Sequence, residues 1–217
     1  MVPKPETPRG AEARQRILAA AAEVFAEHGF TGAGVDAIAA RAGVNKAMLY
    51  YHVGDKASLY AAVVLGFSDQ VRAEIRERLA AAPDPISRLR ALQSAFMAVA
   101  LREPHFPQVM LREIAAGGAN LPPEVLSRMA EIMAVTRDLV VEGQAGGDFR
   151  LVNPLVTHIL VVGSVILLTN VLRLRERLVA VGAPLPETPP DPRAMGELVT
   201  DILLFGIAAR EPLGGVQ

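Results

Sequence analysis

Apolar residues recur along this chain three or four positions apart, which is the spacing of one helical face. No stretch alternates convincingly with a period of two. Stripes of this kind cover residues 12–28, 35–42, 44–53 and 56–82. The first two end at Gly29 and Gly43, where helices commonly stop, and Phe30 can fold back onto the first stripe. The pattern predicts an all-α fold.

The rest of the chain continues the same pattern, with breakers between the segments. Helices are predicted over residues 85–103, 104–116, 123–142, from Pro154, and from Pro192 to about Ala209. Asn153-Pro154 and Asp191-Pro192 each combine a capping residue with proline at the first helical position. We therefore expect about nine helices.

Three short helices lie within about the first 50 residues, and the second and third are joined by a tight turn at Gly43. This spacing predicts a helix-turn-helix, whose second helix enters the DNA major groove. On a helical wheel Leu49 and Val53 project together, while Ala47 and Tyr51 point the opposite way. Tyr50, Met48 and Lys46 flank this outward side. Hydroxyl and ammonium groups there can donate to phosphates, and small or apolar side chains can approach base edges.

Composition changes this interpretation little. The chain has 217 residues, of which 51% are hydrophobic, and its formal net charge is −1. Residues 1–56 hold seven Lys/Arg and six Asp/Glu, so the placement of charge matters more than its sum. The absence of cysteine excludes disulfides and thiolate metal sites. We predict no metal and no cofactor. The first residues have no apolar run of a secretory signal, which favours a cytoplasmic protein.

The segments RQRILAAAAEVFAEHGF and VDAIAARAGVNKAMLYYHVGDKASL resemble the tetracycline-repressor (TetR/AcrR) family of bacterial transcriptional regulators over residues 14–59. The resemblance implies a DNA-binding domain over residues 1–55, and the composition of residues 1–11 favours a flexible tail. A larger ligand-binding and dimerisation domain over residues 56–217 would follow. The resemblance also implies a homodimer, formed through the eighth and ninth helices, that releases a palindromic operator when a small effector binds.

The resemblance assigns candidate DNA contacts as well. Tyr50, His52 and Lys56 would contact phosphate, while Lys46, Ala47, Met48 and Tyr51 would approach base edges or the backbone. Asn45 stands where the family usually has serine and keeps a capping oxygen. Gly34, Met48 and Val53 replace the usual Thr/Ser, Thr/Ala and Phe. No base preference is therefore carried over.

Candidate effector contacts come from the residues alone. Methionine adapts to varied apolar ligands, and it recurs in the fifth to seventh helices. The candidates are Phe96, Met97, Met110, Met129, Met133, His158 and Thr169. Each has a structural alternative, as core filler for the apolar residues and as a satisfied buried histidine for His158. We expect the effector to enter between the fifth and eighth helices. Glu113 could neutralise a cationic ligand, but we expect it to be solvated.

Other interpretations stay open at this point. Tyr50 and Tyr51 could pack on the next helix, His52 could be structural, and Lys4, Arg9 and Arg14 could form a minor-groove arm or a disordered tail. Residues 151–172 lack charge and could span a membrane, although a buried central helix in a bundle has the same composition.

The function we predict is a ligand-responsive DNA-binding regulator, a homodimeric repressor with a small hydrophobic effector, and not an enzyme. The alternatives are a regulator without a small-molecule ligand, a helical enzyme and a membrane-anchored regulator. The enzyme is disfavoured because the chain has no catalytic motif and its four histidines are scattered.

Overall fold

The computed structural model describes residues 8–184 and 191–207. Within these ranges the chain forms nine α-helices and no extended strand, which confirms the predicted all-α fold. The helices are α1 (Pro8–Gly32), α2 (Val35–Ala42), α3 (Lys46–Val53), α4 (Lys56–Ala80), α5 (Pro85–Arg102), α6 (Phe106–Ala115), α7 (Pro123–Gly146), α8 (Pro154–Ala180) and α9 (Pro192–Ile207).

The helices divide into two compact units. Unit 1 comprises the described residues up to Ser68 together with Pro104–Leu126, and unit 2 comprises Asp69–Glu103 and the described residues from Ser127 onward. Helices α4 and α7 therefore each contribute to both units. The functional boundary expected after residue 55 stays a prediction.

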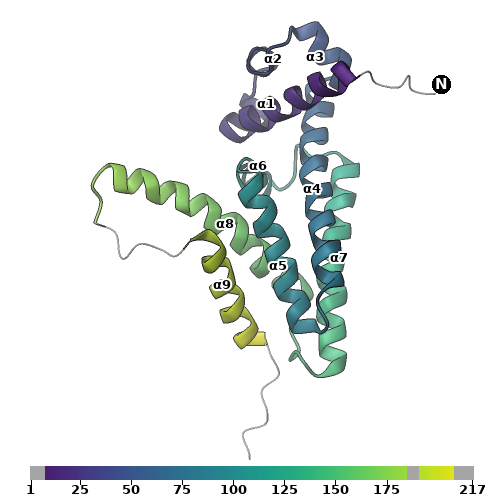
Figure 1. The fold of residues 1–217 in the computed structure, drawn as a ribbon, viewed down its shortest axis with the longest axis vertical. Helices are drawn as coiled ribbons and strands as arrows, with labels where there is room; N and C mark the ends of the chain where they lie inside the picture. The colour runs from purple at the N-terminus through teal and green to yellow at the C-terminus, as the bar shows by residue number, and fades with distance from the viewer. Residues whose placement is uncertain (1–7, 185–190, 208–217) are drawn as a thin grey trace, which may run out of the picture. The chain divides into compact units, whose positions relative to one another are not determined.

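Unit 1 is built around α1, which packs against α2, α3 and α6 (Figure 1). Its core contains Ile17, Phe25, Ile38 and Leu49, all fully buried. Gly29 adopts φ +69° and ψ 176° inside α1 and breaks the helical geometry there. This kink lets Phe30 stack on Phe25, with ring centroids 6.4 Å apart, as the sequence predicted.

The turn between α2 and α3 is short because both of its ends are capped. Gly43 adopts the left-handed conformation at φ +65°, and its N–H donates to the carbonyls of Ala39 and Ala40. Asn45 then accepts a hydrogen bond from the N–H of Met48 at 2.8 Å and begins α3. These two caps fix the direction in which α3, the predicted recognition helix, leaves the turn.

In unit 2, helices α5, α8 and α9 pack against one another (Figure 1). Asn153 accepts from the N–H groups of Leu155 and Val156, and Pro154 follows it, so the predicted cap of α8 is confirmed. Asp191 caps α9 in the same way by accepting from the N–H of Arg193 at 2.9 Å.

Several predicted helix ends differ from the structure. Helix α1 begins at Pro8, four residues before the predicted start, and residues 1–7 lie outside the described ranges. Helix α7 continues to Gly146, past the predicted end at residue 142. Gly143 stays helical there and leaves room for the ring of Phe149, which a Cβ at this position would meet at 2.3 Å. The predicted end of α9 near Ala209 lies beyond the described residues.

Helix α8 is the one described helix long and apolar enough to cross a membrane by length and composition. Its buried residues are Thr157, Val161, Val162, Val165 and Ile166, and none of residues 171–180 is buried. Its own chain therefore covers only part of α8. The apolar surface of α8 that remains exposed needs a further explanation.

Candidate functional site

The outward side of α3 presents the side chains that the sequence predicted. Leu49 is fully buried and holds the helix on unit 1, and Val53 beside it is half-buried. Tyr51 is 85% exposed and Tyr50 43% exposed, so neither packs as a core tyrosine. Lys46, Ala47 and Met48 are exposed on the same helix. An eight-residue helix with one buried residue presents most of its surface for contact.

Lys46 is not free in this arrangement. Its Nζ lies 2.9 Å from Oδ1 and 3.1 Å from Oδ2 of Asp36, at the first turn of α2. The hydrogen bond and the charge of Asp36 raise the pKa of the Lys46 ammonium above its usual value. Both side chains are at least half exposed, so this pair contributes little to stability. Its main consequence is that a carboxylate stands beside the candidate phosphate contact.

The remaining polar candidates lie at the end of α3 and the start of α4. The rings of Tyr51 and His52 meet edge-on at 5.2 Å between centroids. Lys56 donates to the carbonyl of Thr31 at 3.2 Å, and its ammonium lies 5.0 Å from the centroid of the Phe30 ring. Because an ammonium has three donors, this contact leaves capacity for a phosphate oxygen.

Helix α6 packs against α1, the helix that also supports α3. Arg112 donates from Nε to the carbonyl of Ala26 at 3.0 Å and from Nη2 to that of Glu27 at 2.8 Å. These carbonyls precede the kink in α1, where the helical hydrogen bonds run out. Arg112 therefore acts as a side-chain cap on the first segment of α1.

Glu113 is buried, so the expectation that it would be solvated is wrong. It is 2% exposed, and its Oε1 accepts from the hydroxyl of Tyr60 at 2.6 Å and from the amide of Asn120 at 3.0 Å. Its Oε2 has no hydrogen-bond partner in the described part of the chain. Burial, reinforced by Glu113, raises the pKa of the Tyr60 hydroxyl far above its usual value. Tyr60 is thus held as a neutral donor.

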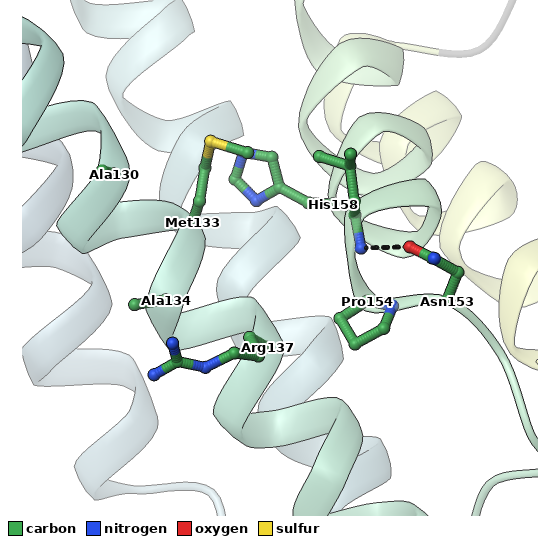
Figure 2. A pocket seen from close by; sticks show the side chains of 8 residues that line it. Ala130, Met133, Ala134, Arg137, Asn153, Pro154 and His158 are labelled. Carbon is green, nitrogen blue, oxygen red and sulfur yellow. Dashed lines mark hydrogen bonds between the residues drawn. The ribbon is translucent and has the colours of Figure 1, made fainter.

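A cavity of about 410 Å³ lies between α7 and α8 in unit 2. Figure 2 shows Met133 of α7 and His158 of α8 facing each other across it, with Pro154, Asn153 and Arg137 around its lower part. Two of the predicted effector contacts therefore line one cavity. The wall is largely apolar and carries few polar groups, which is the usual make-up of a small-molecule pocket.

His158 has a defined partner in this region. Its Nδ1 lies 2.8 Å from the hydroxyl oxygen of Thr136, which is fully buried. Its ring also meets Phe96 edge-on, with centroids 6.5 Å apart. Burial lowers the pKa of the imidazole below 6.5. His158 is therefore a neutral polar group at the cavity wall near pH 7.

The other predicted effector residues do not join this cavity. Phe96 and Met97 are buried in α5, and Met97 lines a different cavity beside α9. Met110 is buried in unit 1. Met129 and Thr169 are half-buried, and the Thr169 hydroxyl donates to carbonyls of its own helix. The recurrence of methionine in several predicted helices did not distinguish these environments.

Asp36 and Thr136 were missed as candidates because their roles depend on partners elsewhere in the chain. The Asp36 carboxylate of α2 pairs with Lys46 of α3, and the hydroxyl of Thr136 meets the ring of His158, 22 positions away. Arg137 and Asn153 at the cavity were also missed, since charged and capping residues rarely signal an apolar pocket. Within the described ranges, no group of three or more His, Cys, Asp or Glu side chains could hold a metal ion.

The short, exposed helix α3 follows a capped turn and packs against α1 and α2. This arrangement defines the helix-turn-helix class of DNA-binding proteins. Residues 17–63 match the family model described as "Bacterial regulatory proteins, tetR family", and residues 82–170 match "Tetracyclin repressor-like, C-terminal domain". The chain belongs to the tetR family of transcriptional regulators.

Curated relatives agree with this assignment. The chain is 44% identical over 85 residues to the transcriptional activator FasR of Mycolicibacterium smegmatis, covering 39% of each chain. It is 32% identical over 142 residues to the repressor NicS of Pseudomonas putida, covering 63% of this chain and 66% of NicS. It is 31% identical over 150 residues to the repressor KstR2 of M. smegmatis, covering 67% of this chain and 72% of KstR2. The alignments thus span less than two thirds of FasR and NicS.

Solved structures share the fold. A TetR-family regulator from Marinobacter aquaeolei superposes with a TM-score of 0.73 at 22% identity, over 93% of this chain and 98% of that one. The ketosteroid transcriptional regulator KstR2 of Mycobacterium tuberculosis gives a TM-score of 0.65 at 23% identity, over 91% and 95%. At these identities the similarity establishes the architecture alone.

Proposed function

We propose that this protein is a cytoplasmic homodimeric repressor that binds an inverted-repeat operator and is released by a small apolar effector. The observation that carries the DNA-binding part is the outward side of α3. Tyr51 is 85% exposed above the fully buried Leu49, on a helix fixed at its start by the Asn45 cap. Repression is favoured by the names of NicS and KstR2, although FasR is named an activator.

Each side chain on this surface has a separate part in our proposal. Tyr50, His52 and Lys56 bind phosphate and set the register on the duplex, since such contacts carry no sequence information. Lys46, Ala47, Met48 and Tyr51 approach the base edges or the backbone, and Met48 can contact a thymine methyl.

Mobility shifts on the DNA that flanks the coding sequence would test this assignment. Tyr51→Ala should weaken binding at least about tenfold, because it removes a central contact of the reading helix. Ile114→Ala on α6, where Ile114 is 57% exposed, serves as the matched surface control and should bind as wild type. Wild-type affinity for Tyr51→Ala would remove α3 from the interface.

The dimer would form through α8 and α9. Exposed apolar residues recur along both helices: Leu155, Val156, Ile159, Leu160, Leu167, Leu198, Ile202 and Phe205. A soluble monomer rarely exposes so much contiguous apolar surface, and a two-fold partner would cover it. Such a dimer would set its two reading helices about 34–36 Å apart, one turn of DNA, and so require an inverted repeat.

The effector would enter the cavity between α7 and α8. Its volume of about 410 Å³ lies within the usual range for ligand sites, about 300–1,000 Å³. Met133 would adapt to an apolar body, and neutral His158 would offer one polar contact. KstR2 of M. tuberculosis is named a ketosteroid transcriptional regulator, which supports an apolar class of effector. The sequence led us to expect entry between the fifth and eighth helices, whereas the position of the cavity favours α7 and α8.

Coupling between effector and operator would run through α4. This helix contributes to both units and begins with Lys56, a candidate phosphate contact. Weakening the operator complex a hundredfold requires about 2.7 kcal/mol of differential affinity, a usual value for allostery. We propose that α4 tilts and changes the spacing of the two reading helices.

A thermal-shift screen of hydrophobic compounds, followed by operator-release assays, would test the effector step. A compound that stabilises the protein should release DNA from wild type. It should fail on Ala134→Trp, which fills the cavity. If every stabilising compound left operator affinity unchanged, the effector step would be wrong while the DNA-binding assignment stood.

A further inference from the structure

A polar groove lies in unit 2, between α5 and α9. Two adjoining cavities occupy it, with volumes of about 160 Å³ and 380 Å³, and three residues line both: Gln93, Ser94 and Glu197. These residues differ from those of the cavity between α7 and α8. The groove therefore needs its own explanation.

Gln93 is the central feature of this groove. It is 3% exposed, and its Nε2 has no hydrogen-bond partner among the described residues. Buried polar groups are normally paired, because an unmade hydrogen bond leaves the cost of desolvation uncompensated. An amide NH₂ group can only donate, so the missing partner must be an acceptor.

The facing helix leaves space for this amide. A Cβ on Gly196 of α9 would lie 2.5 Å from Nε2 of Gln93 and 2.9 Å from Cε of Met97, closer than real side chains approach. Gly196 is buried inside α9, where glycine weakens a helix. The absence of a side chain here keeps the Gln93 amide in the groove between the helices.

Two cations line the smaller cavity, together with the carboxylate of Glu197. Arg193 and Arg78 both line it. The Arg193 side chain has no partner among the residues that the structure places, whereas Arg78 donates to Glu74 at 2.9 Å and to Ser94 at 3.1 Å. Met97 and Ala98 add an apolar wall. One end of the groove thus combines an unpaired donor, cations and apolar surface.

Acidic groups limit what can bind. Glu197 lines both cavities, and Asp201 lines the larger one, where it is paired with Arg90. These carboxylates would repel a dianion such as phosphate about twice as strongly as a monoanion at the same distance, because the Coulomb energy is proportional to the charge. The chemistry favours an organic acid.

We propose that this groove binds a small aliphatic carboxylate of a few carbon atoms. One carboxylate oxygen accepts from Nε2 of Gln93, Arg193 balances the charge, and the chain lies against Met97. The proposal does not depend on the repressor function or on the effector cavity.

Thermal shift with sodium butyrate as the probe tests the site, at constant ionic strength and pH 7.5. At ten times its dissociation constant the ligand should raise Tm by about 3–6 °C. Gln93→Leu removes the donor while keeping the side-chain bulk, and it should abolish this rise. Met133→Ala, in the cavity between α7 and α8, should keep the full rise and serves as the matched control.

A second measurement covers the case in which Gln93→Leu fails to fold. In wild-type protein, the side-chain amide resonances of Gln93 should shift on addition of butyrate, and inorganic phosphate should leave them in place. No rise in Tm with up to 50 mM butyrate (about the limit for a weak site) and no amide shift would overturn the proposal. An equal rise in Gln93→Leu, or an equal effect of phosphate, would overturn it as well.

Discussion

The ammonium of Lys46 on α3 lies 2.9 Å from the carboxylate of Asp36 on α2, so a carboxylate of the neighbouring helix competes with DNA phosphate for this ammonium. DNA phosphates would have to replace or share this partner. Asp36 itself is largely exposed beside the same surface, where it repels phosphate. Asp36 on α2 thereby determines how strongly Lys46 on α3 can bind a DNA phosphate.

Asp36→Asn should therefore bind operator more tightly, by about 3–10-fold at 50 mM salt, with the gain shrinking as salt rises. Mobility shifts across a salt series would measure it. Asp138→Asn on α7 removes the same charge from another exposed ion pair and should change affinity little. Unchanged or weaker binding by Asp36→Asn would show that Asp36 orients Lys46 more than it opposes DNA.

Lys46→Ala addresses the other member of the pair. If Lys46 binds phosphate in the complex, its loss should reduce the log–log salt slope by about one for each half-site. Sequence preference should stay nearly constant, because phosphate contacts carry little base information. A wild-type slope and affinity would remove Lys46 from the contacts.

Tyr60→Phe tests the buried hydrogen bonds that join Tyr60, Glu113 and Asn120. It leaves Oε1 of Glu113 with Asn120 as its one remaining donor, and it should lower the free energy of unfolding by about 1–3 kcal/mol. Urea denaturation would measure this change. Tyr50→Phe is the matched control, since it removes a hydroxyl from an exposed tyrosine and should change stability by less than about 0.5 kcal/mol. Equal stabilities for the two variants would mean that the hydroxyl of Tyr60 contributes nothing.

The features of the reading head that depend on local spacing could be predicted from the sequence. The buried Leu49 and the outward tyrosines follow from the periodicity of a single helix. The capped turn and the start of α8 follow from residue types that favour helix ends, Gly43, Asn45 and Asn153. A recognisable reading helix then identified the class of protein.

What could not be predicted depends on contacts between distant segments. The Tyr60–Glu113 hydrogen bond joins residues 53 positions apart, and no helical pattern distinguishes such a glutamate from a solvated one. The same holds for Thr136 and His158. For α8, a strongly apolar composition did not say whether its own chain or another surface covers it.

His158 predicts a pH dependence of stability. Its pKa in the folded protein lies below 6.5, so the unfolded chain binds a proton more readily as pH falls through this value. The folded state should therefore lose stability between pH 7.5 and 5.5, by at most about 1.4 kcal/mol from this group. His158→Gln removes the contribution, and the difference between the two urea-unfolding curves isolates it. Parallel pH profiles for wild type and variant would contradict the assignment.

The exposed face of α9 predicts where the two subunits meet. Ile202 is 63% exposed beside Leu198, and a stable dimer covers about 600–1,000 Å² on each subunit. Placing a charge there should oppose association, because a desolvated carboxylate without a partner is costly. Ile202→Glu should thus shift the protein to monomer at micromolar concentration in sedimentation velocity, and weaken binding to an inverted repeat. Ile114→Glu on α6, from a similarly exposed isoleucine, should leave the dimer intact. A monomeric wild type, or equal dissociation of the two variants, would place the dimer contact elsewhere or remove it.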